Sequence, residues 1–302
     1  MWVTSVLQTL FSLPYANALV FKGGSSLSKV WSLIRRFSED VDIAVDRSLF
    51  GVEGDVTKKQ LKKLRKESSL FVKEKLAKDI EDRLEELGLA SYCKIEAQPD
   101  GVGNGTYPEP RKIFISYETA FVDEIHSYMD ASVMLEIGAR SLIEPTATAK
   151  VKSLIAANSP VNTTLVDSDI ISAVPEKTFL EKAFLLYELF ATGHCDNANR
   201  KSRHLYDLEC MMDKDFAKVA ITDDELWENI RHHREIFTSV KDIDYSSDIR
   251  KNIILVPPKE VVRDWESDYH AMREQMVYGE SLSFSDLISR MHELEERFHS
   301  RQ

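Results

Sequence analysis

The sequence predicts an α+β fold, with a mixed sheet flanked by helices over residues 1–170 and a helical bundle over residues 171–302. Short apolar or alternating segments, which are typical of β-strands, recur through the first part of the chain. After residue 175 strand patterns nearly vanish, and apolar residues recur at helical spacing. A chain of 302 residues is long enough for two domains of moderate size.

The elements of the first domain follow from apolar spacing and from breaker residues. Helical spacing predicts helices over residues 3–13, 25–34, 57–87 and 149–156. Short apolar or alternating runs predict strands over residues 18–21, 40–45, 92–97, 112–117 and 132–137, and an extended segment over residues 161–166. Gly88 is a suitable C-cap for the longest helix.

The second domain is predicted to be helical throughout. Helical spacing predicts helices over residues 176–190, 200–212, 223–238, 258–276 and 283–298. Ser283 precedes the last of these helices and is expected to cap it.

Composition limits the class of protein. Hydrophobic residues make up 43% of the chain, enough for a sizeable core. With 39 basic and 50 acidic residues the formal charge is −11, so bulk charge does not predict a nucleic-acid binder, although a local patch can carry the opposite sign. No apolar run reaches the roughly 18 residues of a membrane span. The apolar N-terminus lacks a basic region and is broken by Pro14, so we expect a cytoplasmic protein without a signal peptide.

The cysteines also favour a cytoplasmic protein. Cys93, Cys195 and Cys210 are widely spaced and match neither a zinc pattern nor a disulfide framework. We expect free thiols in a reducing compartment.

Two aspartates in an apolar run suggest a metal site. Asp40 and Asp42 lie two residues apart on a predicted strand and would project from one face, while Val41 and Ile43 enter the core. Like charges held side by side are costly unless a cation lies between them. Oxygen ligands suit Mg²⁺ or Mn²⁺. A structural turn containing these two acids is the alternative.

A glycine turn upstream suggests a phosphate site. Gly23, Gly24 and Ser25 follow a strand and open a helix, where backbone N–H groups can bind phosphate, and Lys22 precedes them. A metal site and a phosphate site together predict a nucleotide-handling active site.

Two further features leave alternatives open. On the strand over residues 132–137, Glu136 shares a face with Met134 and is either solvent-facing or part of a site. Residues 58–66 contain six basic residues and no acid, which indicates either a solvated helix face or a contact with a phosphate backbone. The lysines proposed for an RNA contact are Lys58, Lys59, Lys62 and Lys63.

The motifs together resemble a known family. Gly24-Ser25, fourteen residues and then Asp40-x-Asp42 resemble the signature of the nucleotidyltransferase superfamily with the DNA polymerase beta fold. More narrowly, FKGGSSL followed by RFSEDVDIAV is similar to the AbiEii/AbiGii family of nucleotidyltransferase toxins, which includes the MenT toxins. FLEKAFLLYELF and RHLYDLECM match that family's Glu-Lys and Arg-Asp-x-Tyr-Asp-Leu patterns, except that His204 replaces the first acid.

The resemblance implies a nucleotidyltransferase-fold sheet and a role for each matching residue. Asp40 and Asp42 would hold Mg²⁺ or Mn²⁺, with Glu136 as the third carboxylate, and the turn would bind the NTP phosphates. Lys182 would contact the triphosphate as a point charge, and Asp207 would orient Lys182 or the ribose. Ser38 would face the site, at a position where MenT relatives can be phosphorylated. The two domains would contribute the two halves of this site.

The expected activity is a Mg²⁺-dependent transfer of NMP from an NTP to an RNA acceptor such as the 3′ end of tRNA. The enzyme would be the toxin of a type IV-like toxin–antitoxin or abortive-infection system, neutralised by an antitoxin protein. The alternatives are a nucleotidyltransferase that modifies a small molecule or a protein hydroxyl, and a non-catalytic nucleotide- or RNA-binding module. Paired metal carboxylates argue against the last of these.

Overall fold

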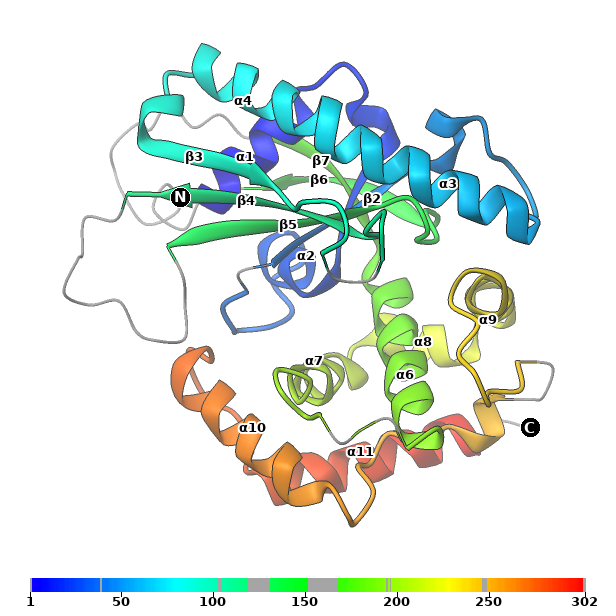
Figure 1. Ribbon diagram of the computed structural model, residues 1–302. Coiled ribbons are helices and arrows are strands. Elements are labelled where there is room, and N and C mark those ends of the chain that lie inside the picture. Colours follow the sequence, from blue (N-terminus) through cyan, green and yellow to red (C-terminus); the bar gives the residue numbers. More distant parts are fainter. Residues whose placement is uncertain are drawn as a thin grey trace. The chain divides into compact units, whose positions relative to one another are not determined.

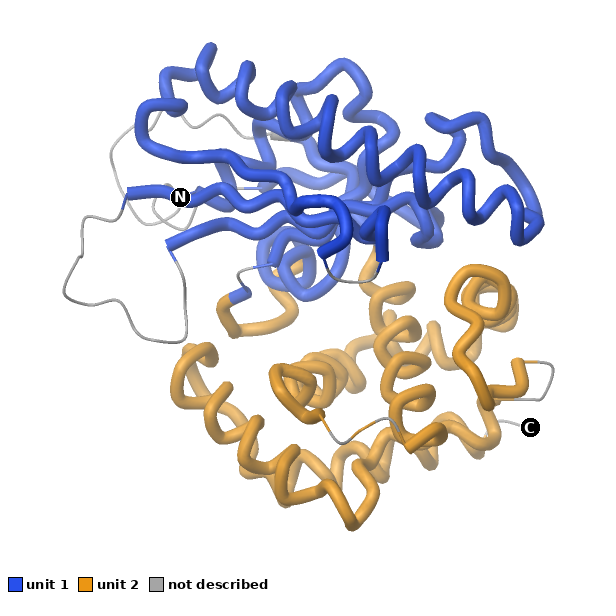
Figure 2. Tube along the Cα trace, viewed as in Figure 1, with its two compact units in different colours: residues 1–30, 38–173 blue, residues 31–37, 174–302 orange. Residues whose placement is uncertain are grey.

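The computed structural model describes residues 2–38, 40–102, 105–118, 131–151, 168–193, 195, 197–245 and 249–300. The chain folds into two compact units (Figure 2). We call residues 1–30 with 38–173 the sheet unit, and residues 31–37 with 174–302 the helical unit.

The sheet unit is built on a mixed sheet (Figure 1). Within the described residues its strands are β1 (Leu19–Lys22), β2 (Asp40–Val45), β3 (Cys93–Ala97), β4 (Arg111–Tyr117), β5 (Ser132–Gly138), β6 (Thr146–Val151) and β7 (Ser168–Ala173). They lie in the order β3-β4-β5-β2-β1-β7-β6. The pairs β1–β7 and β2–β5 are parallel, and the other neighbours are antiparallel. The predicted α+β class with a mixed sheet is confirmed.

Helices cover the two faces of this sheet (Figure 1). On one face lie α1 (Trp2–Phe11) and a long helix made of α3 (Lys58–Leu70), a π-helical turn (Phe71–Leu76) and α4 (Ala77–Glu86). Thr57 and Gln60 form a capping box at the start of α3, as reciprocal side-chain and backbone hydrogen bonds. The short helix α2 (Gly23–Lys29) packs against β1, β2 and β7 on the opposite face.

The alternation of β2 and β5 explains where the core lies. Val41 and Ile43 on β2, and Leu135 and Ile137 on β5, are at most 1% exposed. They are register partners, so they pack on one face, and the intervening residues project to the other face. Asp40 and Asp42 are therefore on the face that α2 partly covers.

One predicted element of the sheet unit is wrong and one strand was missed. The helix expected over residues 149–156 is wrong where the structure describes it, because residues 149–151 belong to β6 and pair with β7. The rest of that helix and the extended segment over 161–166 lie outside the described residues. Strand β7 was missed, since its pairing with β1 and β6 is a tertiary effect that local propensity does not encode.

The helix predicted over residues 25–34 is shorter in the structure. It ends at Lys29, and the following segment Trp31–Phe37 belongs to the helical unit. There the Phe37 N–H donates to Met276 O over 2.8 Å, and the Tyr278 N–H donates to Arg35 O over 2.9 Å. These non-local hydrogen bonds replace the next helical turn.

The helical unit contains α6 (Pro175–Ala191), α7 (Arg203–Met212), α8 (Asp215–Thr222), α9 (Asp224–Phe237), α10 (Val262–Gln275) and α11 (Phe284–His299) (Figure 1). Helix α6 contacts α7, α8 and α9 and is buried on most sides. Aromatic pairs fill the core, including Phe184 with Trp227 at 4.4 Å between ring centroids. The predicted helices are confirmed with shifted ends, the Ser283 cap is present, and α8 was missed. In the described residues, no helix combines the length and apolar character needed to cross a membrane.

Candidate active site

The turn between β1 and α2 touches the aspartate pair. Gly23 has φ +73°, and a Cβ built on it would lie 2.0 Å from Asp42 Oδ2, so this position requires glycine both for its backbone and for the close approach. Ser25 is buried, and its hydroxyl donates to the backbone oxygen of Asp40. The structure thus brings the predicted phosphate turn and the predicted metal ligands together in the sheet unit.

The strand register places the third predicted carboxylate beside the pair. Asp42 is the register partner of Glu136 on β5, and Asp40 is the partner of Met134. Asp40 is 8% exposed and Asp42 is half-buried. The carboxylate of Glu136, however, lies 2.9 Å from the ammonium of Lys112 on β4. Among the described residues, no three Asp, Glu, His or Cys side chains gather closely enough to hold a metal.

The donor set nevertheless fits a hard divalent cation. Asp40 and Asp42 offer oxygen ligands from one face of one strand, next to a glycine turn that leaves room at the Asp42 carboxylate. On the β1 side of β2, Lys22 is the register partner of Asp42. Ser38 is half-buried and lies two residues before Asp40. The residues of the sheet unit predicted to bind metal or nucleotide are therefore neighbours in the structure.

The lysines predicted for RNA contact lie elsewhere in this unit. Lys58, Lys59, Lys62 and Lys63 are exposed on α3. The Arg111 Nε donates to Ser69 Oγ of α3 over 2.9 Å, and Arg111 is the register partner of Ile137 on the core face. Helix α3 consequently covers the sheet face opposite the one that carries the aspartate pair.

Lys182 and Asp207 meet inside the helical unit. Lys182 Nζ on α6 lies 2.8 Å from Asp207 Oδ2 on α7, and both side chains are buried. Arg36 also binds Asp207 with two hydrogen bonds, from Nε over 2.7 Å and from Nη2 over 2.8 Å. His204 Nδ1 is 3.3 Å from Lys182 Nζ.

The charged groups of this cluster shift one another's pKa values. Burial alone would raise the pKa of Asp207, but Arg36 and Lys182 outweigh it and hold that pKa below its ordinary value. Burial and then the Lys182 charge lower the pKa of His204 well below its ordinary value. His204 is therefore neutral at pH 7, and its Nδ1 can accept from Lys182. Burial lowers the pKa of Lys182, and the Asp207 carboxylate opposes this effect. When Lys182 is protonated, it and Arg36 place two cations around one carboxylate, which suits an anionic ligand.

Sequence reasoning missed Arg36 and Lys112. The available signals were local: Arg36 is the second of two arginines between Ile34 and Phe37, and Lys112 shares the face of Glu136 on an alternating strand. Neither signal names a partner, since Arg36 and Asp207 are 171 residues apart.

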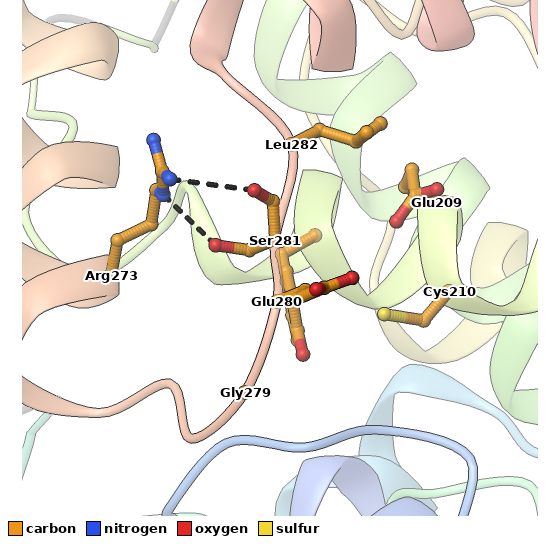
Figure 3. A pocket seen from close by; sticks show the side chains of 8 residues that line it. Glu209, Cys210, Arg273, Gly279, Glu280, Ser281 and Leu282 are labelled. Atoms are coloured by element: carbon orange, nitrogen blue, oxygen red, sulfur yellow. Dashed lines mark hydrogen bonds between the residues drawn. The ribbon is translucent and has the colours of Figure 1, made fainter.

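A cavity of ≈ 560 Å³ also lies in the helical unit (Figure 3). It is lined by Tyr206, Glu209, Cys210, Arg273, Gly279, Glu280, Ser281 and Leu282. The Arg273 guanidinium donates to Ser281 Oγ over 2.9 Å and to Ser281 O over 3.3 Å, so its charge is directed at the wall of the cavity. None of the predicted site residues lines this cavity.

Comparison with known proteins identifies the family. The model of the family described as nucleotidyl transferase AbiEii toxin, type IV toxin–antitoxin system, matches residues 5–290. The structure is similar to that of MenT4, a nucleotidyltransferase toxin from Mycobacterium tuberculosis H37Rv, with a TM-score of 0.57 and 13% identity over 100% of this chain and 82% of that chain. At this identity the likeness supports the fold alone. No curated protein matches the chain significantly.

The family match spans both units and includes the glycine turn, the aspartate pair and the helices that carry Lys182 and Asp207. The predicted family and enzyme class are confirmed. We conclude that the chain belongs to the AbiEii family and is a nucleotidyltransferase toxin of a type IV toxin–antitoxin system.

Proposed function

We propose that this enzyme transfers NMP from an NTP to an RNA acceptor, with the 3′ end of tRNA as the first candidate, and that the transfer depends on Mg²⁺ or Mn²⁺. The observation that carries the proposal is the contact between Gly23 and Asp42, which puts a phosphate-binding turn against a pair of carboxylates. When bound at Asp40 and Asp42, the metal would supply Lewis-acid activation and neutralise developing phosphate charge.

The chain's own residues would act as follows. The backbone N–H groups of Gly23, Gly24 and Ser25 would orient the β- and γ-phosphates. The hydrogen bond from the Ser25 hydroxyl to the backbone oxygen of Asp40 holds this turn against β2. The net positive cluster in the helical unit would bind a phosphate anion through Lys182, which Asp207 orients. We propose that the transfer needs both the glycine turn and Lys182. We also propose that modification of Ser38 regulates the transfer.

Incubation of the protein with each labelled NTP, Mg²⁺ and total tRNA tests this function. We expect a labelled product that RNase destroys, and a loss of at least roughly 100-fold in rate for Asp42→Asn. Failure to label any acceptor with any NTP, by a protein that binds Mn²⁺, would contradict the proposal. Chelation of the metal should abolish the transfer, and Mn²⁺ should restore it.

The placement of α3 favours a second candidate, a small-molecule or protein hydroxyl as the acceptor. The exposed lysines of α3 lie over the face opposite the aspartate pair, so an acceptor need not touch them. We will distinguish the candidates by replacing Lys58, Lys59, Lys62 and Lys63 with Gln. An RNA acceptor bound by α3 predicts a higher KM and a weaker salt dependence, whereas a small-molecule or protein acceptor predicts no change.

A matched control removes the same charge elsewhere. Lys214, Lys218, Lys241 and Lys259 are exposed lysines of the helical unit. If their replacement by Gln raises KM as much as replacement of the α3 lysines, the effect is due to net charge and α3 is not the RNA contact.

The antitoxin partner is implied by the family. We propose that a cognate antitoxin neutralises the transfer activity, and that co-expression with it relieves growth inhibition. The Asp42→Asn variant should be harmless to growth without any antitoxin.

A further inference from the structure

Four charged side chains form a row across the face that carries the aspartate pair. Strand register aligns Lys22 of β1 with Asp42 of β2, Asp42 with Glu136 of β5, and Glu136 with Lys112 of β4. Register partners project from the same face of a sheet. The two acids in the middle of the row are therefore flanked by a lysine on each side.

Lys112 draws Glu136 away from the aspartates. Its ammonium lies 2.9 Å from Glu136 Oε1. Because β5 lies between β4 and β2, a carboxylate that reaches Lys112 points toward β4 and not toward Asp42. This ion pair explains why Glu136 does not complete a three-carboxylate group with Asp40 and Asp42 in the described part of the chain.

The pair is poorly suited to a purely structural role. The Lys112 and Glu136 side chains are 35% and 28% exposed, and ion pairs with this exposure add little to stability. Water reaches both partners, so their separation leaves no buried charge behind. A divalent cation next to Asp42 would attract the Glu136 carboxylate more strongly than a monovalent ammonium does.

We propose that Lys112 is a positioning residue that competes with the divalent metal for the Glu136 carboxylate, and thereby sets the metal affinity of the site at Asp40 and Asp42. This inference rests on the metal site of the proposed function. The ion pair with Lys112 holds Glu136 on the β4 side. Asp40, Asp42 and Glu136 would together hold the metal once it is bound, and Lys112 would then lose its ion pair with Glu136.

Titration of the full-length protein with Mn²⁺, followed by electron paramagnetic resonance without any nucleotide, tests the inference directly. We expect Lys112→Gln to bind Mn²⁺ roughly 10-fold more tightly than the wild-type protein. The matched control is Lys94→Gln: Lys94 lies on β3, pairs with Glu96 over 2.8 Å, and its removal changes the net charge equally. Thermal unfolding of both variants should stay close to that of the wild-type protein, because both lysines are solvent-accessible.

The double variant decides whether the effect passes through Glu136. In a Glu136→Gln background, Lys112→Gln should no longer tighten Mn²⁺ binding. The inference is overturned if Lys112→Gln and Lys94→Gln change the affinity equally, or if the gain persists undiminished in the Glu136→Gln background. If instead Asp42→Asn leaves Mn²⁺ binding unchanged, the metal site itself is wrong, and the proposed function fails with it.

Discussion

Gly23 is required both for the backbone conformation of the turn and for the close approach of the turn to Asp42. Its φ of +73° costs a side-chain-bearing residue about 1 kcal/mol, and an added methyl would occupy the place of the Asp42 carboxylate. We expect Gly23→Ala to lower transfer by roughly 100-fold or more, because a shift of about 1 Å in a reacting group has that effect. Initial rates at saturating NTP and Mg²⁺ measure it.

Gly51 provides the control for Gly23. It has φ +65°, and nothing lies within 4 Å of a Cβ built there. Gly51→Ala should therefore share the loss of stability and keep the transfer rate. Equal losses of activity in the two variants would show that strain, and not the approach to Asp42, is responsible.

Asp207 predicts a pH dependence of stability. The folded state holds its pKa below the unfolded value of about 4, through Arg36 and Lys182 and against the effect of burial. The stabilisation is therefore fully present above about pH 4 and is lost as the pH falls toward the folded-state pKa. We expect Asp207→Asn to cost about 3–5 kcal/mol of unfolding free energy at neutral pH.

The pH profile of denaturant unfolding checks this expectation. The difference between the wild-type protein and Asp207→Asn should shrink between about pH 4 and pH 2. Asp215→Asn, at a fully exposed side chain, should differ little from the wild-type protein at any pH. A gap for Asp207→Asn that does not change with pH would refute the coupling to Arg36 and Lys182.

At the scale of elements, a buried ion pair joins α6 to α9. Glu188 on α6 accepts two hydrogen bonds from the Arg234 guanidinium and one from the Tyr245 hydroxyl at 2.6 Å. Glu188→Gln leaves the Arg234 charge without its counter-ion, and we expect a loss of about 3–5 kcal/mol in denaturant unfolding. Glu235→Gln removes an exposed partner of Arg231, which lies on α9 like Arg234, and should cost less than about 1 kcal/mol. Similar losses in the two variants would contradict this account.

Elements with strong periodicity were predicted well. Strands β2, β4 and β5 and helices α6, α9 and α11 lie within a few residues of the predicted limits, because their apolar periods repeat over several residues and their apolar faces are buried. The end of β6 was mistaken for the start of a helix, although Thr146, Thr148 and Lys150 alternate with apolar residues in this strand. Its pairing with β7 decides its conformation. Local residues specify a period, but not a partner strand.

At the scale of the whole molecule, the chain enters the helical unit twice. Trp31–Phe37 belongs to this unit although it precedes β2 in sequence, and Arg36 within it neutralises Asp207. We expect a fragment of residues 174–302 to unfold at a lower temperature than the same fragment joined to residues 31–37 through a flexible linker. Thermal circular dichroism measures both transitions. If Arg36→Met in the joined fragment unfolds at the same temperature as the joined fragment itself, the Arg36–Asp207 pair is not the cause.

Spacing along the chain is enough to predict the local features of the site. It predicted the common face of Asp40 and Asp42, the adjacent glycine turn, the helices that carry Lys182 and Asp207, and the family. These features are local patterns, and local patterns are set by strand and helix periods.

Which charged side chains meet depends on tertiary packing. It paired Arg36 with Asp207 across 171 residues, and it turned Glu136 toward Lys112 by placing β4 beside β5. The physical reason is that a charge acquires its partner from the packing of distant elements, which no period in the sequence records. Burial then sets the strength of each ion pair, which is high for the buried Lys182–Asp207 pair and low for the exposed Lys112–Glu136 pair.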